Sequence, residues 1–292
     1  RERHWRESSL SRRHRFLEKL HPLLGHKVFC AQSVWESFHH LKALPYLSDH
    51  RVQGSVIMPA AAMVELGLAA AHQLRPATFH TLENLEFLQP IPFSSQGHVR
   101  TQLAIQPDDG TCLLSAQHGD TDNQWYAAAR WEIGEGRPAR VNVDLNSIQE
   151  RFFAPQAAVE IGAAQFYEET SKGGFDFGPA FQGVRRVWLA PSEALGEISL
   201  PELVQGEIGA YFLHPAALDA CMQAAGALLT ISDALAGSVC YVPIRMRRVR
   251  FYSYLSACLW VHALAQSRGG QRVLGDFRIY DQDGVLAAEV EG

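Results

Sequence analysis

Two polar residues, His50 and Asp219, stand beside long apolar stretches and could carry acid–base chemistry. His50 ends a turn-like stretch, residues 45–49, and is soon followed by residues 60–74, which are apolar almost all round. A helix that is apolar on every side is buried. We therefore expect His50 at the mouth of a buried helix, where a neutral imidazole can accept a proton. The alternative is a packed core histidine whose nitrogens are both satisfied.

Gly54 and Pro59 lie between His50 and the first apolar segment. Glycine lets the backbone bend or be approached closely. The fixed φ of proline suits the first position of a helix, so the helix is expected to start at Pro59. Within this helix Glu65 is a second candidate acid, but a hydrogen bond to backbone or to a strand is its favoured role.

Asp219 lies in a second apolar, small-residue segment that opens at His214 and runs to about residue 230. Gln223 shares a helix face with Asp219, so it can hydrogen-bond the carboxyl and hold its rotamer. The helix N-terminus favours the anion by about 0.3–1 kcal/mol. Complete burial raises a carboxyl pKa by up to about 3–5 units and outweighs that effect. The alternative is that Asp219 caps the helix or pairs with an arginine.

A histidine and a carboxylic acid that face each other suit the elimination of water. The imidazole of His50 would remove a proton next to a carbonyl, and Asp219 would protonate the departing hydroxyl. A third stretch, residues 174–183 (GFDFGPAFQG), combines glycines with aromatic residues. A backbone N–H in it could polarise a thioester carbonyl as the enolate develops. The alternative is an aromatic-lined turn that only packs.

The elements that position these groups occur in the same order in both halves of the chain. Strands are expected over residues 27–38, 79–87, 98–106, 111–117 and 125–133, and later over 184–200, 241–251, 258–266, 272–280 and 285–290. Pro59 and Pro215 each begin an Ala-rich buried helix that antiparallel strands follow. This repeat predicts an α+β fold of the double hotdog type, although other α+β arrangements also fit.

Composition limits the function classes. The 292 residues, 47% hydrophobic and 20% charged, are typical of a globular protein of one large or two ordinary domains. A net charge of −5 disfavours nucleic acid as a partner, and no apolar run is long enough for a membrane span. The five scattered cysteines form no CxxC pair, which favours a reducing compartment and argues against a zinc site.

Together these stretches resemble the dehydratase domain of modular type I polyketide synthases. The motif HxxxGxxxxP matches at His50, Gly54 and Pro59, and a GYxYGPxFQG-like motif matches at residues 174–183. HPAxxDxxxQ matches at His214, Asp219 and Gln223, and HPLLG at residues 21–25 resembles the family's usual beginning. One departure is Phe177, which stands where the family often has tyrosine.

The resemblance implies that the chain removes water from a β-hydroxyacyl chain carried on the phosphopantetheine arm of acyl carrier protein, giving an α,β-unsaturated thioester. His50 would be the base and Asp219 the acid, and Gln223 would orient Asp219. Gly178 would bind the thioester carbonyl through its backbone amide. The supporting residues would be Gly54, Pro59, Phe177, Pro179 and His214, of which His214 would shape the start of the helix.

The resemblance also implies no cofactor and no metal. It implies acyl carrier protein, neighbouring acyltransferase and ketoreductase domains and a second copy in a homodimer as partners, and a cytoplasmic location. The expected division is a linker following an acyltransferase (1–20), an N-terminal hotdog (21–135), an inter-hotdog linker (136–160) and a C-terminal hotdog (161–292). Two other functions stay open: a non-catalytic, acyl-chain-binding double hotdog, and a double-bond isomerase or pyran-forming variant.

Overall fold

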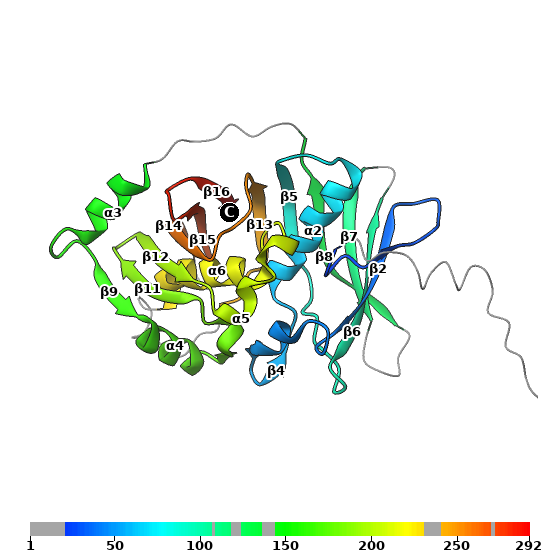
Figure 1. Cartoon of the computed structure of the whole chain (residues 1–292), viewed down its shortest axis with the longest axis horizontal. Coiled ribbons are helices and arrows are strands. Elements are labelled where there is room, and N and C mark those ends of the chain that lie inside the picture. The colour runs from blue at the N-terminus through cyan, green and yellow to red at the C-terminus, as the bar shows by residue number, and fades with distance from the viewer. Residues whose placement is uncertain (1–20, 107–108, 118–123, 136–143, 231–240, 270–271) are drawn as a thin grey trace, which may run out of the picture.

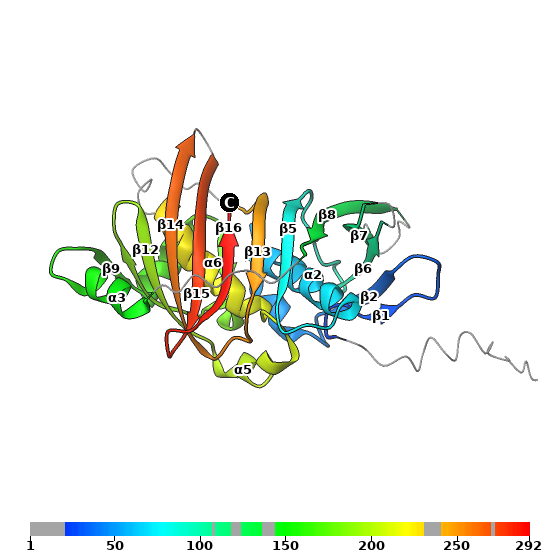
Figure 2. The same ribbon diagram turned by 90° about the horizontal axis from the view of Figure 1, so that it is seen from above.

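The computed structural model describes residues 21–106, 109–117, 124–135, 144–230, 241–269 and 272–292. Two long helices, α2 (Ala60–Leu74) and α6 (Pro215–Thr230), lie in the middle of the molecule, one in each half of the chain (Figure 1). Seen from above, strands from both halves run side by side over these helices (Figure 2). Both helices were expected, α2 with these bounds. Pro59 is the residue before α2 rather than its first residue.

The first half supplies the strands around α2 and a short segment that carries His50. Its elements are β1 (His26–Lys27), β2 (Val34–His40), the 3-10 helix η1 (Pro45–Asp49), β3 (His50–Val52), β4 (Ser55–Val56), β5 (His80–Phe87), β6 (His98–Ile105), β7 (Thr111–Gln117) and β8 (Trp125–Ile133).

The second half begins with small elements and ends with four long strands. Its elements are α3 (Leu145–Phe153), β9 (Val159–Gly162), α4 (Ala163–Lys172), β10 (Phe175–Phe177), the 3-10 helix η2 (Pro179–Phe181), β11 (Val184–Leu189), β12 (Glu193–Ser199), α5 (Glu202–Gln205), the 3-10 helix η3 (Ile208–Ala210), β13 (Arg245–Phe251), β14 (Cys258–Gly269), β15 (Arg272–Asp281) and β16 (Leu286–Glu291).

One 13-stranded sheet contains strands of both halves in the order β1-β2-β6-β7-β8-β5-β13-β16-β15-β14-β12-β11-β9. In the first half the strand order is β2-β6-β7-β8-β5, and in the second half it is β12-β14-β15-β16-β13. In each series a strand that precedes the long helix in the chain comes first. The second, third and fourth strands after the helix follow, and the first strand after the helix comes last. The expected internal repeat is therefore confirmed. The two halves join where β5 pairs antiparallel with β13, for example Leu82 opposite Val249. The fold is an α+β double hotdog.

Small residues let the sheet lie close to both helices. A Cβ added at Gly67 of α2 would come within 2.6 Å of Leu82 Cδ1, and one at Gly196 of β12 would come within 2.7 Å of Ala224 Cβ on α6. Protein interiors are packed as densely as organic crystals, so neither site has room for a side chain. The Ala-rich composition of the helices thus follows from how closely the sheet wraps them.

The predicted linker over residues 136–160 contains regular structure. Helix α3 lies within it, and Leu145, Ile148 and Phe152 of that helix are buried in a second apolar cluster with Trp188 and Tyr280. The described part of the predicted linker is therefore ordered, because these three apolar side chains pack against the second half. Residues 1–20 and 136–143 lie outside the described residues, and the domain boundaries stay a prediction.

A small second sheet ties the halves together near the helix N-termini. Its order is β10-β3-β4, so β10 of the second half pairs with β3 of the first. The register places Phe177 opposite His50 and Phe175 opposite Val52. His50 and the glycine-rich aromatic stretch are therefore held together by backbone hydrogen bonds.

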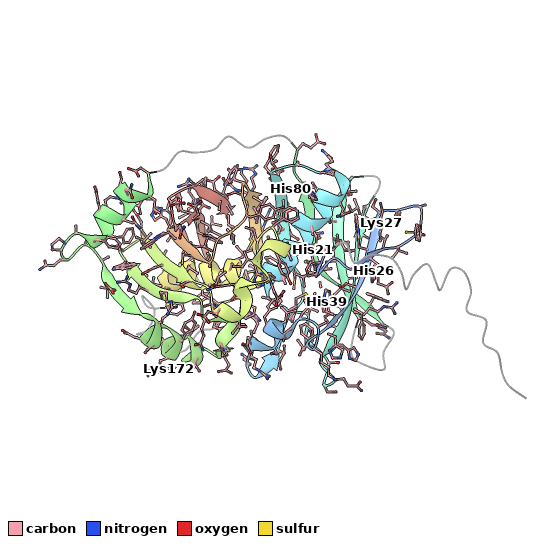
Figure 3. All side chains as sticks on the ribbon, viewed as in Figure 1. His21, His26, Lys27, His39, His80 and Lys172 are labelled. Atoms are coloured by element: carbon pink, nitrogen blue, oxygen red, sulfur yellow. The ribbon has the colours of Figure 1, made fainter. Side chains whose placement is uncertain are left out.

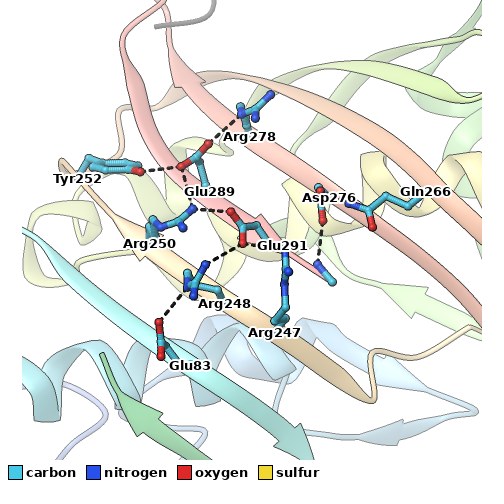
Figure 4. Close-up of polar contacts among 11 residues, drawn as sticks. Glu83, Arg247, Arg248, Arg250, Tyr252, Gln266, Asp276, Arg278, Glu289 and Glu291 are labelled. Atoms are coloured by element: carbon cyan, nitrogen blue, oxygen red, sulfur yellow. Dashed lines mark hydrogen bonds and ion pairs between the residues drawn. The ribbon is translucent and has the colours of Figure 1, made fainter. Parts of the chain in front are cut away.

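Charged side chains reinforce the seam on the face of the sheet drawn in Figure 4. Arg248 of β13 pairs with Glu83 of β5 across the seam and with Glu291 of β16. Nearby, Glu289 accepts a hydrogen bond of 2.6 Å from the Tyr252 hydroxyl. Arg248 and Glu83 are each about one-third exposed, and surface ion pairs contribute about 0–1 kcal/mol, so this pair adds less to the seam than strand pairing and burial do.

Candidate active site

His50 is presented by β3 with one ring nitrogen already bound. Its Nδ1 lies 2.8 Å from the carbonyl oxygen of Ile57. Because a carbonyl oxygen only accepts hydrogen bonds, Nδ1 carries the proton and Nε2 keeps its lone pair. The turn between β3 and β4 makes this contact, with Gln53 and Gly54 at φ values of 50° and 78°. The spacing from histidine to glycine therefore sets the tautomer of His50.

Asp219 lies in the first turns of α6 and is 6% exposed. The side-chain amide of Gln223 donates to its Oδ2 at 2.7 Å, which confirms the expected contact between residues four apart. Burial raises the pKa of Asp219, while the neighbouring His50 and the Gln223 hydrogen bond oppose that rise. This environment favours the protonated acid.

The catalytic pair predicted from the sequence is brought together from the two halves. His50 Nε2 lies 3.8 Å from Asp219 Oδ1, farther than a hydrogen bond reaches. The amide of Gln223 occupies the other carboxyl oxygen, so the acid proton belongs on Oδ1, the oxygen that faces His50. A base with a free lone pair thus stands opposite a buried acid.

Aromatic rings flank the pair. The His50 ring lies 5.6 Å from Phe177 and 5.2 Å from Phe181, centroid to centroid. Phe181 is the last residue of η2, which begins at Pro179, and its side chain is fully buried. A cavity of about 350 Å³ adjoins the site on the Phe177 side. It is lined by Asp49, Arg51, Tyr167, Ser171, Phe175, Asp176, Phe177, Gly178 and Gln182.

The backbone amide of Gly178 is not free for a thioester carbonyl. It donates to the Asp49 carbonyl oxygen at 2.8 Å, so the amide role expected from the sequence does not match this geometry. What the position requires is the absence of a side chain, because a Cβ on Gly178 would lie 2.5 Å from Asp49 Cγ. The Asp49 carboxylate in turn accepts from the Ala180 amide at 2.8 Å. Asp49 therefore couples the loop before His50 to η2.

His214 lies where the sequence places it, at the start of α6. Its Nδ1 accepts from the Ala216 amide at 3.2 Å, and its carbonyl oxygen accepts from the amides of Ala217 and Leu218. Burial lowers the pKa of His214 to about 4, so the ring is neutral at physiological pH. A neutral ring that caps the helix shapes the path of the chain toward Asp219.

Glu65 ties α2 to the segment that leads into α6. Its two carboxylate oxygens accept from the amides of Phe212 at 2.8 Å and Leu213 at 2.7 Å, and the first oxygen also lies 2.9 Å from His21 Nε2. His21 is labelled in Figure 3, near where the halves meet. Burial raises the pKa of Glu65, and these three donors oppose the rise. The expected bond from Glu65 to backbone is confirmed.

Tyr167 and Asp49 belong to the site although the sequence did not single them out. The Tyr167 hydroxyl lies 3.2 Å from Gln223 Oε1 and accepts from the Val184 amide at 2.9 Å. Tyr167 lies in α4, just before the glycine-rich stretch, and nothing in its local sequence marks it as a site residue. Its partner Gln223 is far away in the chain, and no local periodicity marks such a contact.

The described part of the chain holds no group of three or more His, Cys, Asp or Glu residues arranged to bind a metal ion. Among the helices in those same residues, none combines the length and apolar character that crossing a membrane requires.

Family models match most of the chain. A model described as the polyketide synthase dehydratase N-terminal domain matches residues 153–292, and one described as the polyketide synthase dehydratase domain matches residues 21–117. The chain belongs to the polyketide synthase dehydratase family. The family expected from the sequence motifs is thereby confirmed.

Curated relatives are large multidomain synthases. Polyketide synthase GfsA of Streptomyces halstedii is 30% identical over 87% of this chain, and pikromycin synthase component PikAII of Streptomyces venezuelae is 34% identical over 71%. A phenolphthiocerol/phthiocerol polyketide synthase of Mycobacterium tuberculosis is 30% identical over 94%. The chain spans 3%, 6% and 15% of the lengths of these three relatives.

Solved dehydratase domains share the fold over nearly their whole length. The CurJ dehydratase of curacin polyketide synthase has a TM-score of 0.79 and 25% identity, and the match covers 94% of this chain and 96% of that one. A trans-AT dehydratase domain from Brevibacillus brevis has a TM-score of 0.81 at 20% identity, with coverages of 94% and 96%. The latter likeness shows the fold alone.

Proposed function

We propose that this dehydratase-family domain removes water from a β-hydroxyacyl thioester and releases an α,β-unsaturated thioester. The observation that carries the proposal is the 3.8 Å approach of His50 Nε2 to Asp219 Oδ1. The Ile57 carbonyl fixes the proton of His50 on the far nitrogen, and burial favours the protonated form of Asp219. The tautomer of His50 and the raised pKa of Asp219 thus both favour the forms that the proposed reaction needs.

In the proposed reaction His50 Nε2 takes the proton from the carbon next to the thioester carbonyl. The electron pair of that C–H bond forms the new double bond, and the C–O bond at the β-carbon breaks. Asp219 gives its Oδ1 proton to the departing hydroxyl, which leaves as water. The imidazolium then returns a proton to the Asp219 carboxylate, and both groups regain their starting forms.

The aromatic rings of Phe177 and Phe181 supply an apolar wall beside the pair. Electrostatic interactions are stronger where water is excluded, so this wall strengthens the effect of each catalytic group on the other and on substrate. Phe177 has no hydroxyl, so substrate gains no hydrogen bond from this position. The adjoining cavity lies on the Phe177 side, and we place the thioester arm there.

We also propose a setting for this domain. The curated relatives are components of polyketide synthases, which supports neighbouring synthase domains for this one. We propose that the substrate is held on acyl carrier protein, that the neighbours include acyltransferase and ketoreductase domains, and that the domain forms a homodimer in the cytoplasm. Two solved CurK dehydratase variants, one with aspartate replaced by asparagine and one with histidine replaced by phenylalanine, are described as inactive. That description supports His50 and Asp219 as catalytic residues here. We propose that they work without a metal or cofactor.

The test is to incubate the purified domain with β-hydroxyacyl pantetheine thioesters of both β-configurations and with the matching enoyl thioester. Mass spectrometry follows the loss of water, and chromatography follows any movement of a double bond. Loss of water from one configuration supports the proposal. A folded domain that leaves every hydroxyacyl thioester intact contradicts it, and binding without turnover then identifies a non-catalytic acyl-chain-binding domain. Movement of the double bond without dehydration identifies an isomerase.

A further inference from the structure

The side chain of Tyr167 meets the catalytic acid through one intermediary, Gln223. The Tyr167 hydroxyl oxygen accepts from the Val184 amide at 2.9 Å, which leaves its own proton to be donated. The acceptors within reach are Gln223 Oε1 at 3.2 Å and the Phe181 carbonyl oxygen at 3.3 Å. Burial raises the pKa of Tyr167, so the hydroxyl keeps that proton.

The amide of Gln223 is held at both ends. Its Nε2 donates to Asp219 Oδ2 at 2.7 Å and to the Phe181 carbonyl oxygen at 3.1 Å, while its Oε1 faces the Tyr167 hydroxyl. An amide carries donors on nitrogen only and accepts on oxygen only. The Tyr167 hydroxyl and the Phe181 carbonyl therefore both favour the same orientation of the Gln223 amide. In this orientation the NH2 group faces Asp219.

This orientation decides where the acid proton sits. An oxygen that accepts from the Gln223 NH2 group is the unprotonated one, so the proton of neutral Asp219 is on Oδ1, the oxygen 3.8 Å from His50 Nε2. We propose that Tyr167 is a positioning residue that, through Gln223, keeps the proton of Asp219 on the oxygen that faces substrate. The proposal rests on the proposed dehydratase function, in which this proton goes to the leaving hydroxyl.

Replacing Tyr167 by phenylalanine removes the hydroxyl that donates to Gln223. In Tyr167→Phe the ring still packs against Phe166 and Phe177, but Gln223 Oε1 loses its donor. A buried acceptor without a donor is unfavourable, so only the Phe181 carbonyl still favours the present orientation, and the amide turns more readily toward another donor. The proton of Asp219 is such a donor, and it is then withdrawn from Oδ1.

The first test is a double-mutant cycle measured as kcat for dehydration. Tyr167→Phe is combined with Gln223→Met, which keeps the length of the side chain and removes the amide. We expect Tyr167→Phe to lower kcat by about 10- to 100-fold in the wild-type background, a part of the roughly 10²–10⁴ that a general acid supplies. In the Gln223→Met background the same change should lower kcat less than twofold. Tyr126→Phe, which removes a hydroxyl bound to the Pro90 carbonyl, is the matched control.

A purely structural role gives a different pattern. The Val184 amide loses its acceptor in Tyr167→Phe whether or not Gln223 is present. If that loss were the cause, kcat would fall by the same factor in both backgrounds, and the proposal would be overturned. An unchanged kcat in the single variant would overturn it as well.

The second test does not depend on turnover. The hydrogen bond that Gln223 donates lowers the pKa of Asp219. A change that weakens this hydrogen bond, such as Tyr167→Phe, should therefore raise the pKa of Asp219. The other titratable groups that face Asp219 are His50 from β3, Tyr167 from α4 and the buried Cys221 thiol on its own helix.

The carboxyl of Asp219 is titrated by NMR in the folded wild type and in Tyr167→Phe, and we expect the pKa to be higher in the variant. Equal pKa values overturn the proposal. If the wild type fails to dehydrate any thioester but the NMR shift is present, the proposed function fails and the positioning of the Asp219 proton stands.

Discussion

Replacing Glu65 by glutamine tests how the two halves are held together around the site. The carboxylate accepts from the amide of Phe212 with one oxygen and from that of Leu213 with the other. Glutamine has the same shape but one acceptor oxygen, so its NH2 group must face one of these two amides. That amide loses its hydrogen bond in a site with no access to water, since Glu65 is 0% exposed.

A buried donor left without an acceptor costs about 1–3 kcal/mol. Each kcal/mol lowers the melting temperature of a domain of this size by about 2–4 °C. We therefore expect Glu65→Gln to melt about 2–12 °C below wild type. Removing a buried charge is favourable, but it offsets only part of the free-energy cost of the unpaired amide. Its kcat should also fall, since Phe212 and Leu213 lead directly into α6.

The assay is thermal unfolding followed by circular dichroism, with Glu36→Gln as the matched control. Glu36 pairs with Arg100 on an exposed face of the sheet. Exposed pairs contribute about 0–1 kcal/mol, so the control should melt close to wild type. If Glu65→Gln melts at the same temperature as Glu36→Gln, the carboxylate does not hold the start of α6, and the reasoning is refuted.

Three further predictions concern Gly178, Gly54 and the protonation of Asp219. Gly178→Ala places a Cβ 2.5 Å from Asp49 Cγ, so we expect about 1–3 kcal/mol of destabilisation in urea and a lower dehydration rate; wild-type values for both would contradict the contact. Gly54→Ala adds a Cβ in open space at a φ of 78°, so left-handed strain alone should lower the stability by about 1–2 kcal/mol, a prediction that fails if urea titration shows no change. The profile of kcat/KM against pH should fall at high pH as Asp219 loses its proton. Because burial raises the pKa of Asp219, that alkaline limb should lie above the range of an exposed carboxyl; a limb within that range would contradict the assignment.

Local patterns predicted the elements that carry the site. The apolar segment of α2 has no polar face, which made its bounds visible in the sequence. Gly54, at a left-handed φ, turns the chain so that the Ile57 carbonyl meets His50, and the histidine-to-glycine spacing encodes that turn. The contact of Asp219 with Gln223 follows from helix geometry alone.

Contacts between distant segments were not visible. Asp49 meets Gly178, and Tyr167 meets Gln223, only because β3 pairs with β10 and α4 packs beside that strand. A glycine in an aromatic stretch gave no sign that its amide already had a partner. Helix α3 was missed because glycine, proline and arginine precede its three buried apolar residues, a composition typical of linkers.

The division of labour between base and acid is tested most directly by the dehydration rate of His50→Ala and Asp219→Asn on the same β-hydroxyacyl thioester as wild type. His40→Ala and Asp283→Asn, which change a histidine of β2 and an exposed aspartate of the β15–β16 turn, are the matched controls. We expect each catalytic variant to stay folded and to lose about 10²–10⁴ in kcat, while the controls keep the wild-type rate. A folded His50→Ala or Asp219→Asn protein that dehydrates as fast as its control would contradict the account.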